Sequence, residues 1–391
     1  MDDDYRLACA ALSYLAEPAD QRLAAVVAAC GPQVTVDAII RGALPAQAAT
    51  ALGTRPAARK AAGLAMERWR TRLAELPARQ TLEAHALAGI RLVCPGDPEW
   101  PSRLDDLAGA APYALWVRGN GDLRFACVRS VAVVGSRAAT GYGSWVATEI
   151  AADLAAAGWT VVSGAAYGID AAAHRGALGA GGITVAILAC GADQAYPVGH
   201  AGLLDHIAAD GVVASEWPPG RTPTRMRFLV RNRVIAALTT ATVVVEAGER
   251  SGALNTARHA RDLHRIIMAV PGPVTSQTSA GCHVMIRDWQ ATLVRGAEDV
   301  LEMVRPFGEM SSGEQPPLTQ AMARDLLNAD QAAVLDALPA RGGAGPATIA
   351  ALAGIDMPTV LASLGALAAT GLAERCPRGW RASKAATDTR K

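Results

Sequence analysis

Short runs of β-branched and apolar residues alternate with helix-like segments between about residues 130 and 305. The runs are Val131–Val134, Thr160–Val162, Ile183–Leu188, Val212–Val213, Thr242–Val245 and Arg265–Val270. Near-continuous apolar runs are typical of strands that are buried on both faces of a parallel sheet. Their alternation with helices predicts an α/β fold, a mostly parallel sheet with right-handed crossovers, over residues 126–305. Ligands bind such sheets beyond the carboxyl ends of the strands, so functional residues should follow the runs.

The flanking segments have other patterns. Residues 1–75 carry apolar positions at helical spacing and a break at Gly31-Pro32, which predicts a small helical module of the SAM or helix-hairpin-helix kind. Residues 76–125 are rich in proline and glycine and are interpreted as a connecting segment. Residues 306–322 are predicted to be a linker. Residues 323–385 then predict three helices and a hairpin, a winged-helix-like module that could contact either DNA or protein.

Composition narrows the class of protein. The chain has 391 residues, 51% of them hydrophobic, which predicts two or three domains with substantial cores. No apolar run reaches the roughly 18 residues of a membrane helix, and the acidic start is unlike a secretory signal. We therefore expect a cytoplasmic protein without membrane contact. The seven cysteines are scattered without C-x-x-C spacing, so we expect neither a metal site nor a disulfide.

The first candidate loop is Gly135-Ser136-Arg137, which follows the first strand, with Gly141 and Gly143 at the start of the next helix. Glycines there let backbone amides and a helix N-terminus approach an anion, although a tight structural turn has the same pattern. The nicotinamide fingerprint is not met, because Val146 stands at its third glycine and no acid ends the second strand. We therefore expect no cofactor.

The second candidate loop runs from Ser163-Gly164 to Gly168, and Asp170 and His174 follow it four residues apart. The two side chains could form an acid–base pair. Alternatively, Asp170 caps the helix and His174 is its partner. Because no nucleophile accompanies them, we do not expect a catalytic site.

The most informative segment runs from Pro218 to Arg233. It contains Arg221, Arg225, Arg227, Arg231 and Arg233, no acid, and one of the three phenylalanines of the chain, Phe228. Arginines interleaved with an aromatic ring are what a groove for single-stranded nucleic acid needs, because the cations follow phosphates while the ring stacks a base. Two alternatives remain: Phe228 belongs to the core, and the arginines nearest the sheet are structural. A fourth loop, with Ser251 and Gly252, should reach the same edge.

These blocks together resemble the DNA processing protein A (DprA/Smf) family. The blocks are Val133-Val134-Gly135-Ser136-Arg137, Ser163-Gly164 through Gly168-Ile169-Asp170, Phe228 through Arg231-Asn232-Arg233, Glu246 with Ser251-Gly252, and Ala269-Val270-Pro271-Gly272. The resemblance covers about residues 95–305. It implies a Rossmann-like, doubly wound domain that binds single-stranded DNA in a basic pocket. It also implies a homodimer that protects incoming DNA and hands it to the RecA recombinase during natural transformation.

The resemblance also suggests a set of DNA-binding residues. Arg137 matches the arginine of the first loop, Phe228 matches the aromatic position, and Arg225 matches a basic position three residues earlier. The predicted DNA contacts are Gly135, Ser136, Arg137, Ser163, Gly164, Gly168, Arg225, Phe228, Arg231, Asn232, Arg233, Ser251 and Gly252. Two positions depart from the family pattern, His283 and the stretch Trp289-Gln290.

Two other functions compete with DNA binding. The second loop also resembles lysine-decarboxylase-like phosphoribohydrolases, which hydrolyse nucleotides and use a P-G-G-x-G-T-x-x-E stretch. Here the corresponding place is Ser251-Gly252 to Thr256, followed by His259 with no glutamate. The other alternative is a protein-interaction scaffold. We expect a binding protein rather than an enzyme.

Overall fold

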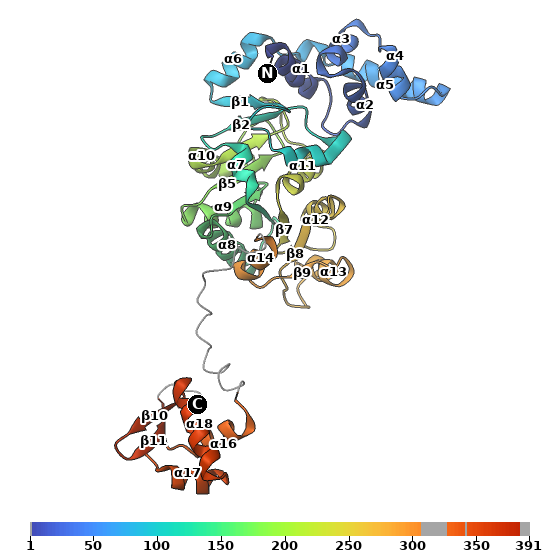
Figure 1. The fold of residues 1–391 in the computed structure, drawn as a ribbon. Coiled ribbons are helices and arrows are strands. Elements are labelled where there is room, and N and C mark those ends of the chain that lie inside the picture. The colour runs from blue at the N-terminus through green and yellow to red at the C-terminus, as the bar shows by residue number, and fades with distance from the viewer. Residues whose placement is uncertain (1, 306–326, 341, 384–391) are drawn as a thin grey trace. The chain divides into compact units, whose positions relative to one another are not determined.

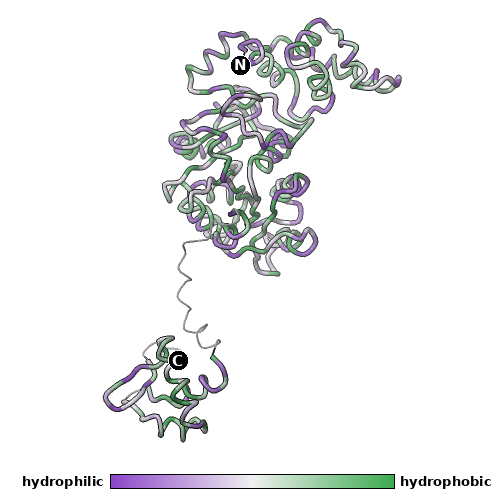
Figure 2. The backbone as a smooth tube through the Cα atoms, in the orientation of Figure 1, coloured by the Kyte–Doolittle hydropathy of each residue, from purple (hydrophilic) through white to green (hydrophobic). Residues whose placement is uncertain are grey.

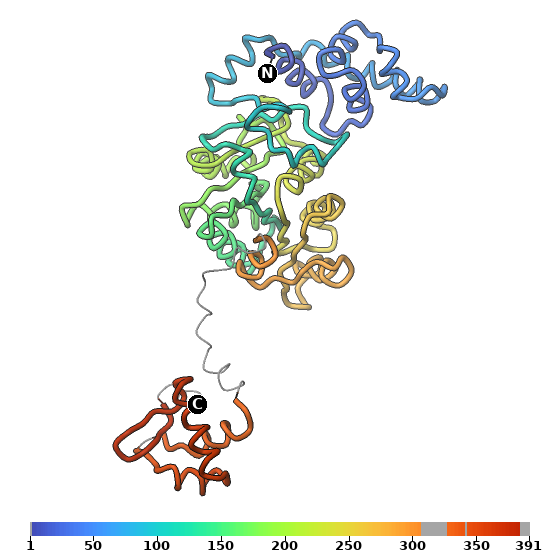
Figure 3. Tube along the Cα trace, in the orientation of Figure 1, coloured from blue at the N-terminus to red at the C-terminus, as the bar shows by residue number. Residues whose placement is uncertain are grey.

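The computed structural model describes residues 2–305, 327–340 and 342–383. It divides into two compact units, Met1–Arg305 and Pro306–Lys391, which are described separately here. The predicted linker at 306–322 lies outside the described residues. Figure 3 follows the chain of the first unit from its N-terminal helices into the sheet.

The first unit is built on a nine-stranded sheet with the order β1-β2-β6-β5-β4-β3-β7-β8-β9. The strands from β6 to β9 in that order are parallel, and all six predicted strands are among them. Their bounds are β3 Ser130–Val134, β4 Thr160–Ser163, β5 Thr184–Leu188, β6 Val212–Ser215, β7 Ala241–Val244, β8 Ile266–Ala269 and β9 Thr292–Leu293. The predicted Rossmann-like, mostly parallel fold is confirmed.

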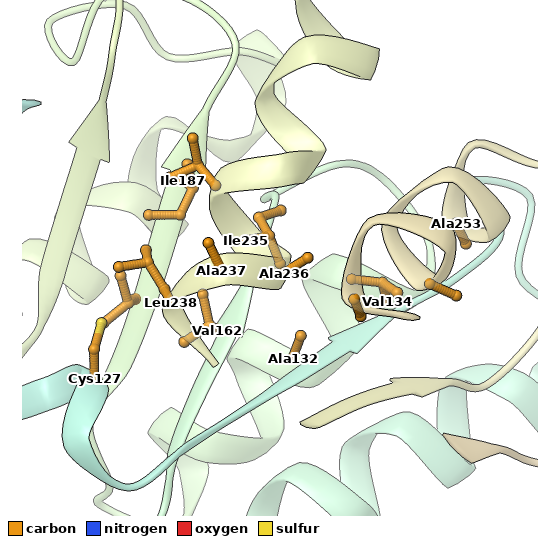
Figure 4. Packing of buried hydrophobic residues seen from close by; sticks show 14 of the residues in the cluster. Cys127, Ala132, Val134, Val162, Ile187, Ile235, Ala236, Ala237, Leu238 and Ala253 are labelled. Carbon is orange, nitrogen blue, oxygen red and sulfur yellow. The ribbon is translucent and has the colours of Figure 1, made fainter. Parts of the chain in front are cut away.

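Helices cover both faces of this sheet (Figure 1). One face packs against α8 (Gly141–Ala156), α9 (Ile169–Gly179) and α14 (Ala297–Val304), and the other packs against α7 (Leu123–Val128), α11 (Arg225–Leu238) and α12 (Gly252–Asp262). Successive residues of β3 serve opposite faces: Val131 and Val133 belong to the first core, and Ala132 and Val134 to the second. In Figure 4 the end of α11, from Ile235 to Leu238, lies over the second core. A strand buried on both faces explains why the apolar runs are continuous.

The segment 76–125 is more regular than predicted. It contains α6 (Arg79–Leu87), β1 (Ile90–Val93), the 3-10 segment Ser102–Ala110 and β2 (Leu115–Arg118). β2 pairs antiparallel with β6, and β1 pairs antiparallel with β2. These two strands extend the sheet, and their outer face packs against α1 through Trp116 and Tyr14.

The predicted N-terminal helices are α1 (Asp3–Leu15), α2 (Gln21–Cys30), α3 (Pro32–Arg41), α4 (Ala46–Ala51) and α5 (Pro56–Arg70). Their small core is centred on Leu12, Leu23 and Trp69, each fully buried. Hydropathy along the chain alternates within these helices, and the more continuous apolar stretches lie in the sheet (Figure 2). Within the described residues, no single helix combines the length and hydrophobicity needed to cross a membrane, although two bent helix pairs meet those criteria together.

The second unit has the predicted order of three helices and a hairpin. These are α16 (Ala329–Ala337), α17 (Pro346–Ala353) and α18 (Met357–Ala369), followed by the antiparallel strands β10 (Ala373–Cys376) and β11 (Gly379–Ala382). Val334, Ile349, Val360 and Leu367 form its separate core. Its membership of the winged-helix class stays a prediction.

Candidate nucleic-acid interface

A pocket of about 710 Å³ opens where the order of the strands reverses. β3 lies between β4 and β7, so the chain leaves β3 toward one side of the sheet and returns on the other. This switch point is where doubly wound sheets bind their ligands. The pocket is lined by the loop after β3, by the start of α11, and by the loop that precedes α12 together with the first turns of that helix.

An arginine and two aromatic rings form one wall of the pocket. The guanidinium carbon of Arg137 lies 4.3 Å from the centre of the Phe228 ring, within cation–π range. The Tyr196 ring is 5.5 Å from the Phe228 ring and tilted by 47°. Phe228 is only partly buried, so it is not a core residue. The first loop and the basic segment therefore meet, as the sequence predicted.

Arg225 is exposed at the first position of α11 and lines the same pocket. Its neighbour Thr224 caps the helix, because its hydroxyl accepts a hydrogen bond from the amide of Arg227. A cation gains nothing from the positive end of a helix dipole, so helix stability does not explain an arginine at this position. Among the residues that the structure describes, no hydrogen bond or ion pair engages the Arg225 guanidinium. Arg225 is thus available to an external anion.

Two arginines of the basic segment hold the N-terminal helices instead. Arg227 donates two hydrogen bonds to the Glu17 carboxylate, at 2.7 and 3.1 Å, and the Trp217 indole donates a third at 3.1 Å. Arg221 forms an ion pair with Glu75 and lies over the Tyr14 ring. These two cations therefore join the N-terminal helices to the start of α11.

The last two arginines of the segment are buried. Arg233, 3% exposed, binds both oxygens of Glu216 at 2.6 and 2.7 Å and also donates to the carbonyl of Ala110. Arg231, 4% exposed, donates to the carbonyls of Gly164 and Ile187. Burial lowers the pKa of Arg231 to about 10, partly opposed by the nearby Asp170, so Arg231 stays charged at neutral pH. Both side chains are structural in this state of the protein, although Arg231 also forms part of the pocket floor.

The glycines of the first loop accommodate an internal anion. The Glu246 carboxylate, at the end of β7, accepts hydrogen bonds from the amide and hydroxyl of Thr140, at 2.9 and 2.6 Å. Thr140 is the N-cap of α8, so Glu246 occupies the place where a phosphate would meet this helix. A Cβ on Gly143 would overlap the Glu246 carboxyl. The structural alternative therefore explains Gly143.

The second loop is arranged in the same way. The Asp170 carboxylate accepts hydrogen bonds from the amides of Gly164 and Ala166, at 3.1 and 3.4 Å. Burial raises the pKa of Asp170, while Arg231 and these amides oppose the rise. A Cβ on Gly164 would overlap the Arg231 guanidinium, and one on Gly168, where φ is +78°, would overlap the Ser136 carbonyl. These glycines therefore serve close packing.

His174 is a core histidine. Its Nδ1 lies 2.7 Å from the hydroxyl of Thr184, which itself donates to the carbonyl of Val161. The hydroxyl proton is thus committed, so Nδ1 must donate, and Nε2 is the unprotonated nitrogen, buried without a partner. Burial lowers the pKa of His174 to about 3. The interpretation of His174 as the partner of Asp170 was wrong, because Thr184 has that place.

The predicted contacts divide into two groups. Those that line the pocket are Gly135, Arg137, Arg225, Phe228, Arg231, Asn232, Ser251 and Gly252. Those outside its lining are Ser136, Ser163, Gly164, Gly168 and Arg233. Four further residues that were not predicted also line the pocket: Tyr196, Arg250, Asn255 and Arg258. The sequence offered a signal for Arg250 and Arg258 only, namely their positive charge near Ser251-Gly252.

Fold and pocket together define a Rossmann-like protein whose switch-point pocket is cationic and aromatic. The model of the DNA recombination-mediator protein A family matches residues 91–305. The chain belongs to this family.

Its relatives include a DprA protein of Mycobacterium tuberculosis (strain H37Rv), which is 43% identical over 395 residues, 98% of this chain and 96% of the relative. DNA processing protein DprA of Streptococcus pneumoniae (strain R6) is 41% identical over 192 residues, 49% of this chain and 66% of the relative. The X-ray structure of DprA from Streptococcus pneumoniae matches with a TM-score of 0.60 and 30% identity, over 78% of this chain and 99% of that one.

Proposed function

We propose that this protein binds single-stranded DNA in the pocket between α11 and α12. The observation that carries the proposal is the convergence of Arg137, Arg225 and Phe228 from two distant segments on one pocket. The two arginines supply cations for phosphates, and Phe228 with Tyr196 supplies rings for bases. A duplex keeps its bases stacked inside, so an aromatic ring within a pocket favours an unpaired strand.

The family resemblance extends the proposal to the biological role. In this role the protein forms a homodimer in the cytoplasm, protects incoming DNA and delivers it to the RecA recombinase during natural transformation. The family name, a recombination mediator, supports this extension. The proposed role is binding and delivery, without a chemical step.

A nucleotide-hydrolysing function is not favoured. Glu246, which follows β7 beside the glycine-rich first loop, is held by Thr140. The place three residues after Thr256 that would carry a catalytic glutamate holds His259. Asp170 and His174 are both buried and engaged by the fold.

The experiment is a fluorescence-anisotropy titration of labelled oligonucleotides, single- against double-stranded, at two salt concentrations. We expect preference for the single strand and strong weakening by salt, because bound arginines release counterions. Arg225→Ala should lower the salt slope by about 1, and Arg225→Lys should retain it. Arg59→Ala, which removes an exposed arginine of α5, is the matched control and should change nothing. Absence of binding at low salt, or equal binding of duplex, would overturn the proposal.

A further inference from the structure

The pocket lining extends along α12 as far as an arginine that also contacts a tryptophan ring. Arg258 lines the pocket, and its guanidinium carbon also lies 5.3 Å from the centre of the Trp289 ring. Arg261 lies 5.0 Å from the centre of the same ring. Residues three positions apart share one face of a helix, so both guanidinium groups lie on the face of α12 that meets Trp289.

Both arginines remain available to a ligand. Arg258 and Arg261 are exposed, and Trp289 is half-buried against the core under α12. The nearest ion pair of Arg261, with the adjacent Asp262, spans 4.0 Å and leaves the guanidinium open to solvent. For Arg258, no ion pair joins it to any residue within the described part of the chain. A cation–π contact restricts each long side chain without neutralising its charge.

Cation–π contacts order arginines on both sides of the pocket. On one wall the Phe228 ring holds Arg137, and beyond the other wall the Trp289 ring holds Arg258 and Arg261. From Gly252 at the pocket to Arg261, α12 rises about 13 Å. A chain of phosphates that leaves the pocket along this helix would meet two ring-held cations, Arg258 and Arg261, toward the end of that distance.

We propose that Trp289 is a positioning residue for a second phosphate-binding site, formed by Arg258 and Arg261, along which the single strand leaves the pocket. This inference rests on the proposed function and assigns the strand its direction across the protein. A ring at this position orders two flexible arginines before binding, which reduces the entropy lost when phosphates arrive. The ligand is the sugar-phosphate backbone, so the site should be indifferent to base sequence.

The test compares two oligonucleotide lengths on the full-length protein. One, of about five nucleotides, occupies the pocket alone, and one of about fifteen nucleotides also follows α12. Arg261→Ala should leave the affinity for the short oligonucleotide within about twofold, while it weakens the long one about fivefold and lowers its salt slope by about 1. Trp289→Ala should weaken the long one similarly, and Trp289→Phe should restore most of the loss because a ring is retained.

Arg287→Ala is the matched control. It removes an arginine two residues from Trp289 whose side chain is 88% exposed, and it should change neither affinity. Because Arg261 is exposed, its replacement does not endanger folding, so the test does not depend on Trp289→Ala being stable. Equal losses on both lengths, or no loss on the long oligonucleotide, would overturn the second site. If the wild type bound neither oligonucleotide, the proposal that the pocket binds single-stranded DNA would itself be wrong.

Discussion

The two halves of α11, residues 225–230 and 231–238, each carry two arginines but differ in their roles. The first half carries Arg225 and Phe228 on a pocket wall, and the second half buries Arg231, Asn232 and Arg233 in the molecule. Both halves belong to one continuous helix. The difference lies in what the guanidinium groups meet. Arg225 faces the pocket and Arg227 binds the Glu17 carboxylate, whereas Arg231 and Arg233 bind buried carbonyls and a buried carboxylate.

The comparison shows that a cluster of arginines in a sequence overstates the cationic surface. Of the five arginines between Pro218 and Arg233, two hold the N-terminal helices, two are buried, and Arg225 is exposed to the pocket. Arginine suits the structural roles because its planar fork can satisfy several acceptors at once. Binding capacity therefore has to be assigned residue by residue.

The largest effect should come from breaking the buried half. Arg233→Ala would leave the Glu216 carboxylate, 4% exposed, without its bidentate partner. Removing one member of a buried ion pair typically costs about 3–5 kcal/mol of stability. Urea-induced unfolding, followed by circular dichroism, measures the loss.

The matched control for that prediction is Arg225→Ala on the same helix. Its side chain is exposed and without an ion pair in the described structure, so its free energy of unfolding should change by about 0.5 kcal/mol or less. If the two variants were equally stable, the division of α11 into a structural and a binding half would be refuted.

The same comparison separates what the sequence could predict from what it could not. Strand positions were predictable because β3 to β8 are buried on both faces, and burial leaves continuous apolar runs such as Val131–Val134. The convergence of Arg137 and Phe228 followed from the rule that parallel sheets bind ligands beyond the carboxyl ends of their strands. The role of Gly143 could not be predicted, because its partner Glu246 is about a hundred residues away. A glycine-rich turn has the same sequence whether it accommodates a phosphate or a carboxylate.

The sheet edge was missed for a related reason. β1 and β2 have four residues each and lie among prolines and glycines, so their local signal is weak. They are strands because β2 pairs with β6, β1 pairs with β2, and α1 packs on Trp116 of β2, all of which are long-range contacts. Likewise Tyr196 reaches the pocket from a loop with no distinguishing motif.

A smaller effect, on binding alone, is expected at the other half of α11. Phe228→Ala should weaken the binding of single-stranded DNA by about 1–3 kcal/mol, because it removes a stacking surface. It also removes the ring that orders Arg137. Anisotropy titrations at one salt concentration give the loss, and urea unfolding of the same variant shows whether the fold is intact.

Phe228→Leu sharpens this prediction, because it keeps much of the apolar volume without a ring to stack. We expect it to bind nearly as weakly as Phe228→Ala. Recovery of wild-type affinity in Phe228→Leu would mean that the ring acts through packing. Residue 228 would then have a structural role, like the buried residues of the second half of α11.

The smallest effect should come from the contact between α11 and the N-terminal helices. Burial raises the pKa of Glu17, but hydrogen bonds from Arg227 and Trp217 outweigh it and lower the pKa from 4.5 to about 2. A carboxylate with a lowered pKa in the folded state stabilises the protein above its unfolded pKa and loses that contribution as the pH falls toward the folded pKa. Glu17→Gln should therefore reduce stability at pH 7 by about 1 kcal/mol or less, since the side chain is 45% exposed.

The pH dependence distinguishes this contact from a simple loss of packing. Between pH 4.5 and about 2, Glu17 of the wild type takes up its proton, so the difference in unfolding free energy between wild type and Glu17→Gln should shrink across that window. Glu83→Gln, on the exposed face of α6, removes the same charge at a site where the described structure shows no ion pair, and it is the matched control. A difference that stayed constant down to pH 2 would mean that Arg227 holds the helices through packing on Trp217 rather than through charge. In that case only the buried half of α11 would depend on ion pairs for its stability.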